Sequence, residues 1–366
     1  MSKMEYKDLI AFHPGYYLKD IIEDMGITQD EFAKRLNTTG KHLSDLLNGK
    51  CGLSKELALN LSIMFGTTLD VWLNLQKTYT EKVLEIERMK AEDNEVECVN
   101  LIDYSFFVNL GVVPKRRLAT DKVRELLKYF KISSFEVFKQ PDFLVSYRTA
   151  IQTVSEKNII NSNAWVQTAI NIGKEKETKE YNSKRLRSHL DEIRGMTIQD
   201  PKDFYPRLVE IFASCGIAFV SLPHLQNSGV NGAIKWLNKE KVILAINDRR
   251  KYLDTFWFCL FHEIGHVLQE KITMLIVSRD MDEMDEINKA LEDDANRFAQ
   301  DILLPEKAYA KLINNNDFSE GHIREFAAGI NIHPGIVVGR LQKENYIGFD
   351  RLTGLKGKYV AAVFKI

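Results

Sequence analysis

The amino-acid sequence predicts a mainly α-helical protein with one small β-sheet, which places it in the α+β class. Apolar residues recur at helical spacing over most of the chain. Three short apolar runs with β-branched residues, each bounded by Gly, Asn or Pro, lie between residues 217 and 246 and predict the sheet. The chain has 366 residues, more than one hydrophobic core usually organises, so we expect domains over residues 1–79, 80–200 and 201–366.

The composition is that of an ordinary globular protein, with 45% hydrophobic and 28% charged residues. No run of about 18 apolar residues occurs, and Met1–Phe12 carries acidic residues where a signal peptide needs basic ones, so we expect a cytoplasmic protein without a membrane partner. The cysteines Cys51, Cys98, Cys215 and Cys259 show no C-x-x-C spacing and are expected to be free thiols. The formal net charge is -1, so any DNA binding must come from a local patch.

The first domain is predicted to be a bundle of short helices. Turn residues separate five blocks of helical periodicity, and a Ser or Thr able to accept a hydrogen bond from the first helical turn precedes most of them. Thr28 with Glu31 also forms a capping-box pattern. The five predicted helices are Gly15–Met25, Thr28–Leu36, Thr39–Leu47, Ser54–Phe65 and Thr68–Lys77.

Two of these helices have the spacing of a helix-turn-helix. Small Ala33 lies where the helices Thr28–Leu36 and Thr39–Leu47 would cross. The second helix is then the reading helix, and its outward polar side chains can donate to phosphates or base edges. The alternative is a bundle that makes only protein contacts. The candidate DNA-binding residues are Gln29, Thr39, Lys41, His42 and Ser44.

The middle region is expected to be helical and to carry no chemistry. Residues 80–97 are highly charged and predict a solvated helix that leads out of the first domain. Further helices are predicted over Asp121–Phe130, Asp142–Thr153 and Asn163–Lys174.

The last region mixes strands and helices. The predicted strands are Ile217–Ser221, Ala233–Leu237, Val242–Ile246 and, at the end of the chain, Lys358–Ile366. The predicted helices are Phe204–Cys215, Asp254–Glu270, Glu283–Leu303, Pro305–Asn314, Glu320–Ala328 and Pro334–Lys343.

The strongest chemical signal is the motif His262-Glu263-x-x-His266 within an apolar helix. Histidines at i and i+4 project from one helical face, so both imidazoles can bind one zinc ion. The carboxylate of Glu263 lies where it can act as the general base on a water molecule. The alternative, packed histidines without a metal, is less favoured because polar side chains in an apolar helix would be buried without partners.

A third ligand is expected from the later helix, where Glu292, Asp293 and Asp294 are adjacent. Helical periodicity turns Asp293 away from the buried stripe and leaves Glu292 and Asp294 possible. His322 and His333 could polarise a scissile carbonyl, although each is better explained as a surface histidine.

The C-terminal motifs resemble those of the ImmA/IrrE metallopeptidases, zinc enzymes of the gluzincin type. The resemblance covers about residues 201–343 and rests on His262-Glu263-x-x-His266, Glu292-x-x-Ala295-Asn296-x-Phe298-Ala299 and Leu303-Leu304-Pro305. It implies that the third zinc ligand is Glu292. It also implies cleavage of helix-turn-helix repressors, either a partner or the chain itself.

The N-terminal motifs resemble those of HigA-type antitoxins, which have the lambda-repressor-like helix-turn-helix fold. The resemblance rests on His13-Pro14-Gly15, Leu46-Leu47-Asn48-Gly49-Lys50 and Val71-Trp72-Leu73-Asn74-Leu75-Gln76. It implies a homodimer that binds operator DNA and, in many relatives, an RNase toxin. Asn37 stands where the family commonly has glycine, but Asn tolerates the left-handed conformation of such a turn.

Together these features predict a transcriptional regulator with a zinc-dependent peptidase domain. The alternative is an antitoxin or autorepressor whose zinc domain senses a ligand or serves as a scaffold with little turnover. A third possibility is an enzyme that makes no DNA contact.

Overall fold

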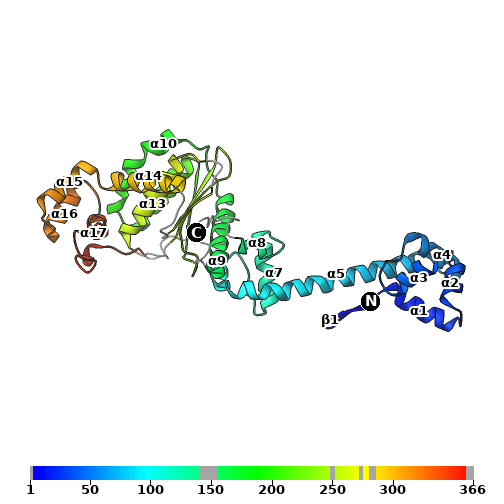
Figure 1. Ribbon diagram of the computed structural model, residues 1–366. Coiled ribbons are helices and arrows are strands. Elements are labelled where there is room, and N and C mark those ends of the chain that lie inside the picture. The colour runs from blue at the N-terminus through cyan, green and yellow to red at the C-terminus, as the bar shows by residue number, and fades with distance from the viewer. Residues whose placement is uncertain (1–2, 141–154, 248–251, 272–274, 280–285, 360–366) are drawn as a thin grey trace. The chain divides into compact units, whose positions relative to one another are not determined.

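A computed structural model describes residues 3–140, 155–247, 252–271, 275–279 and 286–359. The chain folds into two compact units, Met1–Glu97 and Cys98–Ile366, which are described separately below. Helices dominate and strands are few, which confirms the predicted α+β class (Figure 1). In the described part, no helix is both long enough and apolar enough to cross a membrane. The predicted helix Asp142–Thr153 and most of the predicted strand Lys358–Ile366 lie outside the described residues.

The first unit is a helical bundle with its own core. The first four helices agree with the predicted ones to within one residue at each end. Buried apolar side chains from all of these helices, including Leu18, Phe32, Leu46, Leu61 and Trp72, form the core. The helices are α1 (Pro14–Asp24), α2 (Gln29–Arg35), α3 (Gly40–Leu47), α4 (Lys55–Phe65) and α5 (Leu69–Asn100).

Three predicted N-caps form as hydrogen bonds. The Thr28 hydroxyl accepts from the backbone N–H of Glu31 at 3.2 Å, that of Thr39 accepts from His42 at 3.1 Å, and that of Ser54 accepts from Leu57 at 3.1 Å. The capping box at Thr28 is only half formed, because the Glu31 carboxylate pairs with Arg35 on its own helix.

One prediction for this unit is wrong. The sequence predicts a helix that ends at Lys77 and a second one over residues 80–97, whereas α5 runs without a break from Leu69 to Asn100. No Gly or Pro interrupts this stretch. Thr80 lies within this helix, and its hydroxyl donates to the Gln76 carbonyl at 2.9 Å instead of capping a new helix.

A β-hairpin that the sequence analysis did not predict precedes α1. Strands β1 (Lys3–Tyr6) and β2 (Leu9–Phe12) pair antiparallel. Lys7, in the turn, has a left-handed backbone with φ +52°. The Tyr6 hydroxyl donates to the Asp93 carboxylate on α5 at 2.5 Å, and the Lys7 ammonium pairs with the same carboxylate at 2.6 Å. The contacts of Tyr6 and Lys7 with Asp93 therefore hold the hairpin against α5.

The second unit contains a four-stranded sheet surrounded by helices. Its strands are β3 (Ile217–Leu222), β4 (Val230–Trp236), β5 (Val242–Asn247) and β6 (Leu275–Arg279). Its helices are α6 (Tyr104–Asn109), α7 (Ala119–Phe130), α8 (Glu136–Lys139), α9 (Glu156–Glu175), α10 (Ser183–Ser188), α11 (Leu190–Gly195), α12 (Pro201–Ser214), α13 (Leu253–Leu268), α14 (Glu286–Leu303), α15 (Glu306–Asn315), α16 (Glu320–Gly329) and α17 (Pro334–Lys343).

The strand order in the sheet is β3-β5-β4-β6. Strand β3 runs parallel to β5, and the other neighbours are antiparallel. The three strands predicted between residues 217 and 246 are all present, while β6 was not predicted. The register between β4 and β6 shifts between Val230 and Gly232. This irregularity lies beside the candidate site described below.

Helices cover both faces of the sheet (Figure 1). Gly173 of α9 lies against the Ile243 side chain, whereas Gly232 of β4 lies against the Glu263 side chain of α13. Gly232 pairs with Ile246, and Ile243 and Ile246 point to opposite faces because successive strand residues alternate. Helices α9 and α13 therefore lie on opposite faces, and α13 is held between the sheet and the helices α14 and α17.

Candidate metal centre and DNA-binding surface

Helix α13 is an apolar helix that carries three polar side chains into the protein interior. Its buried apolar residues include Trp257, Phe261 and Ile264. The motif residues on the same helix are almost completely inaccessible: His262 is 6% exposed, Glu263 1% and His266 0%. Because buried polar groups need partners, these three side chains must interact with other groups in the protein interior.

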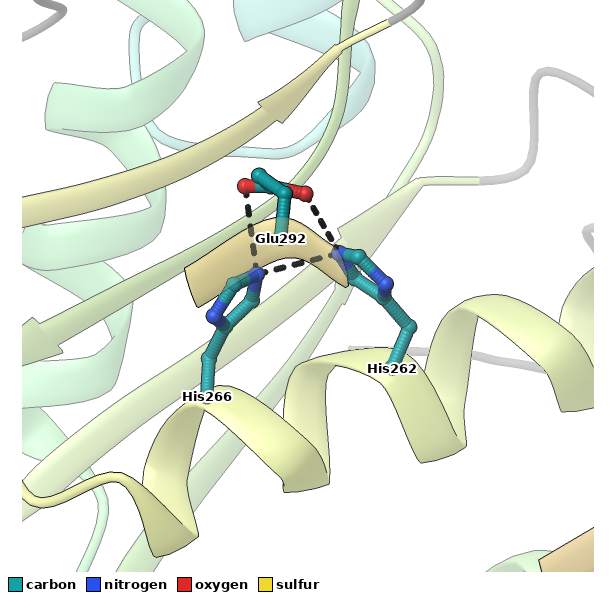
Figure 2. A group of neighbouring side chains, drawn as sticks. All are labelled: His262, His266 and Glu292. Carbon is teal, nitrogen blue, oxygen red and sulfur yellow. Dashed lines mark hydrogen bonds and ion pairs between the residues drawn. The ribbon is translucent and has the colours of Figure 1, made fainter. Parts of the chain in front are cut away.

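The three candidate ligands converge on one point (Figure 2). The Nε2 atoms of His262 and His266 lie 3.0 Å apart. The Glu292 carboxylate, from α14, places Oε2 3.1 Å from His262 Nε2 and Oε1 3.2 Å from His266 Nε2. One ligand atom from each of the three residues lies within 4.8 Å of the ligand atoms of the other two. These side chains form a possible His-His-Glu metal site.

Two amide side chains, which the sequence analysis missed, orient the imidazoles. His262 Nδ1 lies 3.1 Å from Asn296 Oδ1, and His266 Nδ1 lies 2.9 Å from Gln269 Oε1. Gln269 Nε2 donates to the Leu291 carbonyl at 2.7 Å, so its oxygen is the atom that faces His266. An imidazole that donates from Nδ1 to such an oxygen has Nε2 available to bind a cation.

This arrangement fits a cation. Two imidazole lone pairs and a carboxylate face one another at about 3 Å, and such a group is stable only with a proton or a metal ion between its members. In the protein without a metal, a proton must lie between these groups. The shifted pKa values of Glu292 and His266 agree with this. Burial raises the pKa of Glu292, but hydrogen bonds and charge from both histidines lower it more, to about 2. Burial lowers the pKa of His266, but Glu292 and Glu263 raise it overall.

The contact between α13 and α14 depends on small residues. A Cβ on Gly265 would meet the Ala295 Cα at 3.1 Å and its Cβ at 3.3 Å, as well as the Phe298 ring at 3.3 Å. Because Gly265 has no side chain, the backbone of α14 comes close to α13 at this point. This close approach brings Glu292 within reach of both histidines.

Glu263 is not one of the three converging residues. Its carboxylate lies against the backbone of β4, where a Cβ at Gly232 would come within 2.1 Å of Glu263 Oε1 and 2.5 Å of Cδ. Strand β4 thus fixes the side-chain position of the predicted base through a residue without a side chain. The sequence analysis gave no sign of this role for Gly232.

The other candidate residues of this region lie elsewhere. Asp293 and Asp294 are exposed, and Asp294 lies 3.9 Å from Arg297 rather than in the cluster. His333 caps α17, since its Nδ1 accepts from the Gly335 N–H at 3.1 Å. His322 is half-buried in the first turn of α16. The structure therefore brings Glu292, and not Asp294, to the histidines.

The candidate DNA-binding residues lie on α2 and at the start of α3. Gln29, Thr39 and Lys41 are exposed, and His42 and Ser44 are half-buried. The turn between the two helices forms as expected, because Asn37 adopts the left-handed conformation with φ +55°. Gln29 is the first residue of α2, Thr39 is the N-cap of α3, and Lys41, His42 and Ser44 lie on α3 itself.

Comparison with known proteins gives separate matches for the two parts of the chain. Residues 226–329 match the IrrE N-terminal-like domain. Virulence-associated protein A' of Dichelobacter nodosus is 40% identical over 93 residues, which are 23% of this chain and 81% of that protein. The uncharacterized HTH-type transcriptional regulator YddM of Escherichia coli is 30% identical over 81 residues, or 21% of this chain and 86% of that protein. No solved structure matches the chain significantly.

Proposed function

We infer a function from the family to which the chain belongs, the HTH-type transcriptional regulators, here joined to an IrrE/ImmA-like peptidase domain. We propose that the chain is a DNA-binding regulator whose C-terminal domain binds zinc and hydrolyses a peptide bond in a repressor-like protein. The substrate is a second helix-turn-helix repressor or another copy of this chain.

The observation that carries the proposal is the convergence of two imidazole nitrogens and one carboxylate in the buried site. Two nitrogens and one oxygen are one of the ligand sets of catalytic zinc sites, which keep a further position for water or substrate. Asn296 and Gln269 hold the histidines in the tautomer that a metal requires. His262, His266 and Glu292 would therefore hold the ion.

Zinc in this site would act as a Lewis acid that makes a water molecule more acidic and polarises the scissile carbonyl. Glu263 follows His262 directly in the chain and is buried beside the same site. Its carboxylate accepts the proton of the attacking water and then delivers it to the leaving amine. The apolar helix around the motif excludes bulk water, which strengthens each charge interaction during the reaction.

In this proposal the N-terminal unit directs the protein to its operator DNA. Gln29, Thr39, Lys41, His42 and Ser44 contact operator DNA, with α3 as the reading helix. A homodimer would present two such helices to the two halves of a palindromic site. An RNase toxin is a further candidate partner of this unit.

The test combines metal analysis with cleavage. We expect about one zinc in the wild type and in Glu263→Gln, and loss of zinc in His262→Ala and Glu292→Ala. Asp294→Asn is the matched control, because this neighbouring carboxylate is exposed and lies outside the cluster. Each protein is then incubated with purified helix-turn-helix repressors and with a second copy of the chain, and only the wild type and Asp294→Asn should cleave.

Other results would point elsewhere. Zinc without cleavage of any repressor would favour the autorepressor in which the zinc domain is a sensor or scaffold. Absence of zinc from the wild type, or full retention by Glu292→Ala, would refute the metal site.

A further inference from the structure

The half-buried ring of Phe258 lies on the same face of α13 as the candidate metal ligands. Phe258 lies four residues before His262, and His266 lies four residues after it, so all three side chains project from one face of the helix. The Phe258 and His262 rings are stacked, with centroids 6.2 Å apart and planes 30° apart. A half-buried aromatic ring therefore borders the site at this end.

A lysine ammonium lies over this ring. Lys343 is the last residue of α17, and its Nζ is 4.8 Å from the Phe258 centroid. Among the ion pairs of the described residues, none includes Lys343. Arg340 on the same helix is different, since its guanidinium pairs with Glu344 at 2.8 Å. Among the described residues, no carboxylate therefore pairs with the ammonium of Lys343, which lies over the ring next to His262.

The distances limit what this charge can reach. Contacts of 6.2 Å and 4.8 Å place the ammonium at most about 11 Å from the centre of the His262 ring. An extended peptide advances about 3.3–3.6 Å per residue, so this span corresponds to about three residues. A side chain close to the scissile bond of a bound peptide would lie within range of Lys343.

We propose that Lys343 and Phe258 form a subsite that selects an acidic substrate residue within about three positions of the scissile bond. This inference rests on the proposed peptidase function. The carboxylate of the substrate pairs with the ammonium, and the aliphatic part of that side chain packs on the ring. The ring also limits hydration of the ammonium on one side, which strengthens its attraction for an anion. Lys343 lies outside residues 226–329, so the charge is not part of the segment that matches the family.

The experiment measures binding and does not need turnover. The probes are acetylated trialanine hydroxamates in which each alanine in turn is replaced by glutamate or by glutamine, its uncharged match. The hydroxamate group binds zinc, and the dissociation constant is measured by calorimetry with the zinc-loaded full-length protein. The variants are Lys343→Met and Lys343→Glu. Lys307→Met is the control, because Lys307 is an exposed lysine on α15 in the same unit.

At one position at least, glutamate should bind the wild type and Lys307→Met about three- to fivefold more tightly than glutamine. Lys343→Met should abolish this preference, and Lys343→Glu should reverse it. The inference is overturned if all hydroxamates bind the wild type but glutamate and glutamine are equal at every position, or if Lys343→Met keeps the preference. If the protein holds no zinc and binds no hydroxamate, the proposed function fails and this inference fails with it.

Discussion

The contact between Gly232 and Glu263 predicts that Gly232→Ala separates metal binding from catalysis. The new methyl carbon would lie 2.1 Å from Glu263 Oε1, 2.5 Å from Cδ and 2.9 Å from Cγ, all closer than real Cβ atoms allow. Strand β4 is bonded to β5 on one side and to β6 on the other, so its backbone has little freedom to withdraw. The carboxylate of Glu263 must move instead.

The magnitude follows from these distances. Ordinary contact begins at 3.4 Å, so the carboxylate oxygen must shift by about 1.3 Å. A misplacement on the order of 1 Å costs about 100-fold in rate when a group must be aligned for the reaction. We expect Gly232→Ala to lower kcat about 100-fold, with zinc content unchanged, because the three nearest atoms all belong to Glu263 and none to a candidate ligand.

The assay compares zinc content, thermal unfolding and cleavage of a repressor that the wild type hydrolyses for Gly232→Ala, Glu263→Gln and the wild type. Gly321→Ala is the matched control, because a methyl group added on α16 at Gly321 would meet nothing within 4 Å. Overpacking can cost about 1–3 kcal/mol, so the unfolding curve shows whether the fold survives. A Gly232→Ala protein that cleaves at the wild-type rate, or that loses its zinc, would refute the reasoning.

Four further predictions concern other contacts. Gln269→Leu removes the acceptor that orients His266 and should weaken zinc binding about 10- to 100-fold in a chelator competition, and unchanged affinity would contradict this role. In the zinc-free protein, the pKa of Glu292 is lowered to about 2 from 4.5, so its ionised form stabilises the fold above pH 4.5 and this contribution is lost as the pH falls toward 2. Urea titrations across this range should show that Glu292→Gln has a flatter pH dependence than the wild type. Thr39→Ala removes an N-cap and should cost about 1 kcal/mol in the unfolding of the first unit, followed by urea denaturation. Lys41→Ala should weaken operator binding and reduce the slope of log K against log salt by about 1, whereas an unchanged slope would exclude a phosphate contact.

The sequence was most informative where local chemistry decides the structure. The helix starts at Thr28, Thr39 and Ser54 depend on hydroxyls that bond within three residues, and all three form. The end of a helix is harder to predict when no Gly or Pro marks it. This is why α5 continues beyond Lys77, where the composition changes from apolar to charged without a breaker.

The part of the candidate site that lies on a single helix could be predicted from the sequence. Histidines at i and i+4 have to share a face, and the structure has both on one side of α13. The choice between Glu292 and Asp294 depended on the rotation of a second helix, which periodicity alone left open. Gln269 lies three residues from His266, and Asn296 four residues from Glu292, so this helical spacing was a usable signal that the analysis missed.

Contacts between distant segments could not be derived in this way. Gly232 lies on a strand, Glu263 on a helix, and 31 positions separate them in the numbering, so nothing local connects the glycine to the base. Lys343 is brought to Phe258 by the packing of α17 on α13. The hairpin strands β1 and β2 are four residues long and carry little periodicity, and β6 is similarly short.

The buried apolar residues of α1 to α5 form a cluster of their own, and those of α10 to α17 and the sheet form another, with no member in common. Cooperativity in unfolding follows such shared cores, so we expect each of these two clusters to belong to its own cooperative unit. A destabilising change in one core need not be felt in the other. Recombination between genes could accordingly exchange the N-terminal helical unit or the unit with the candidate metal centre, and a lineage could replace one without having to refine the other again.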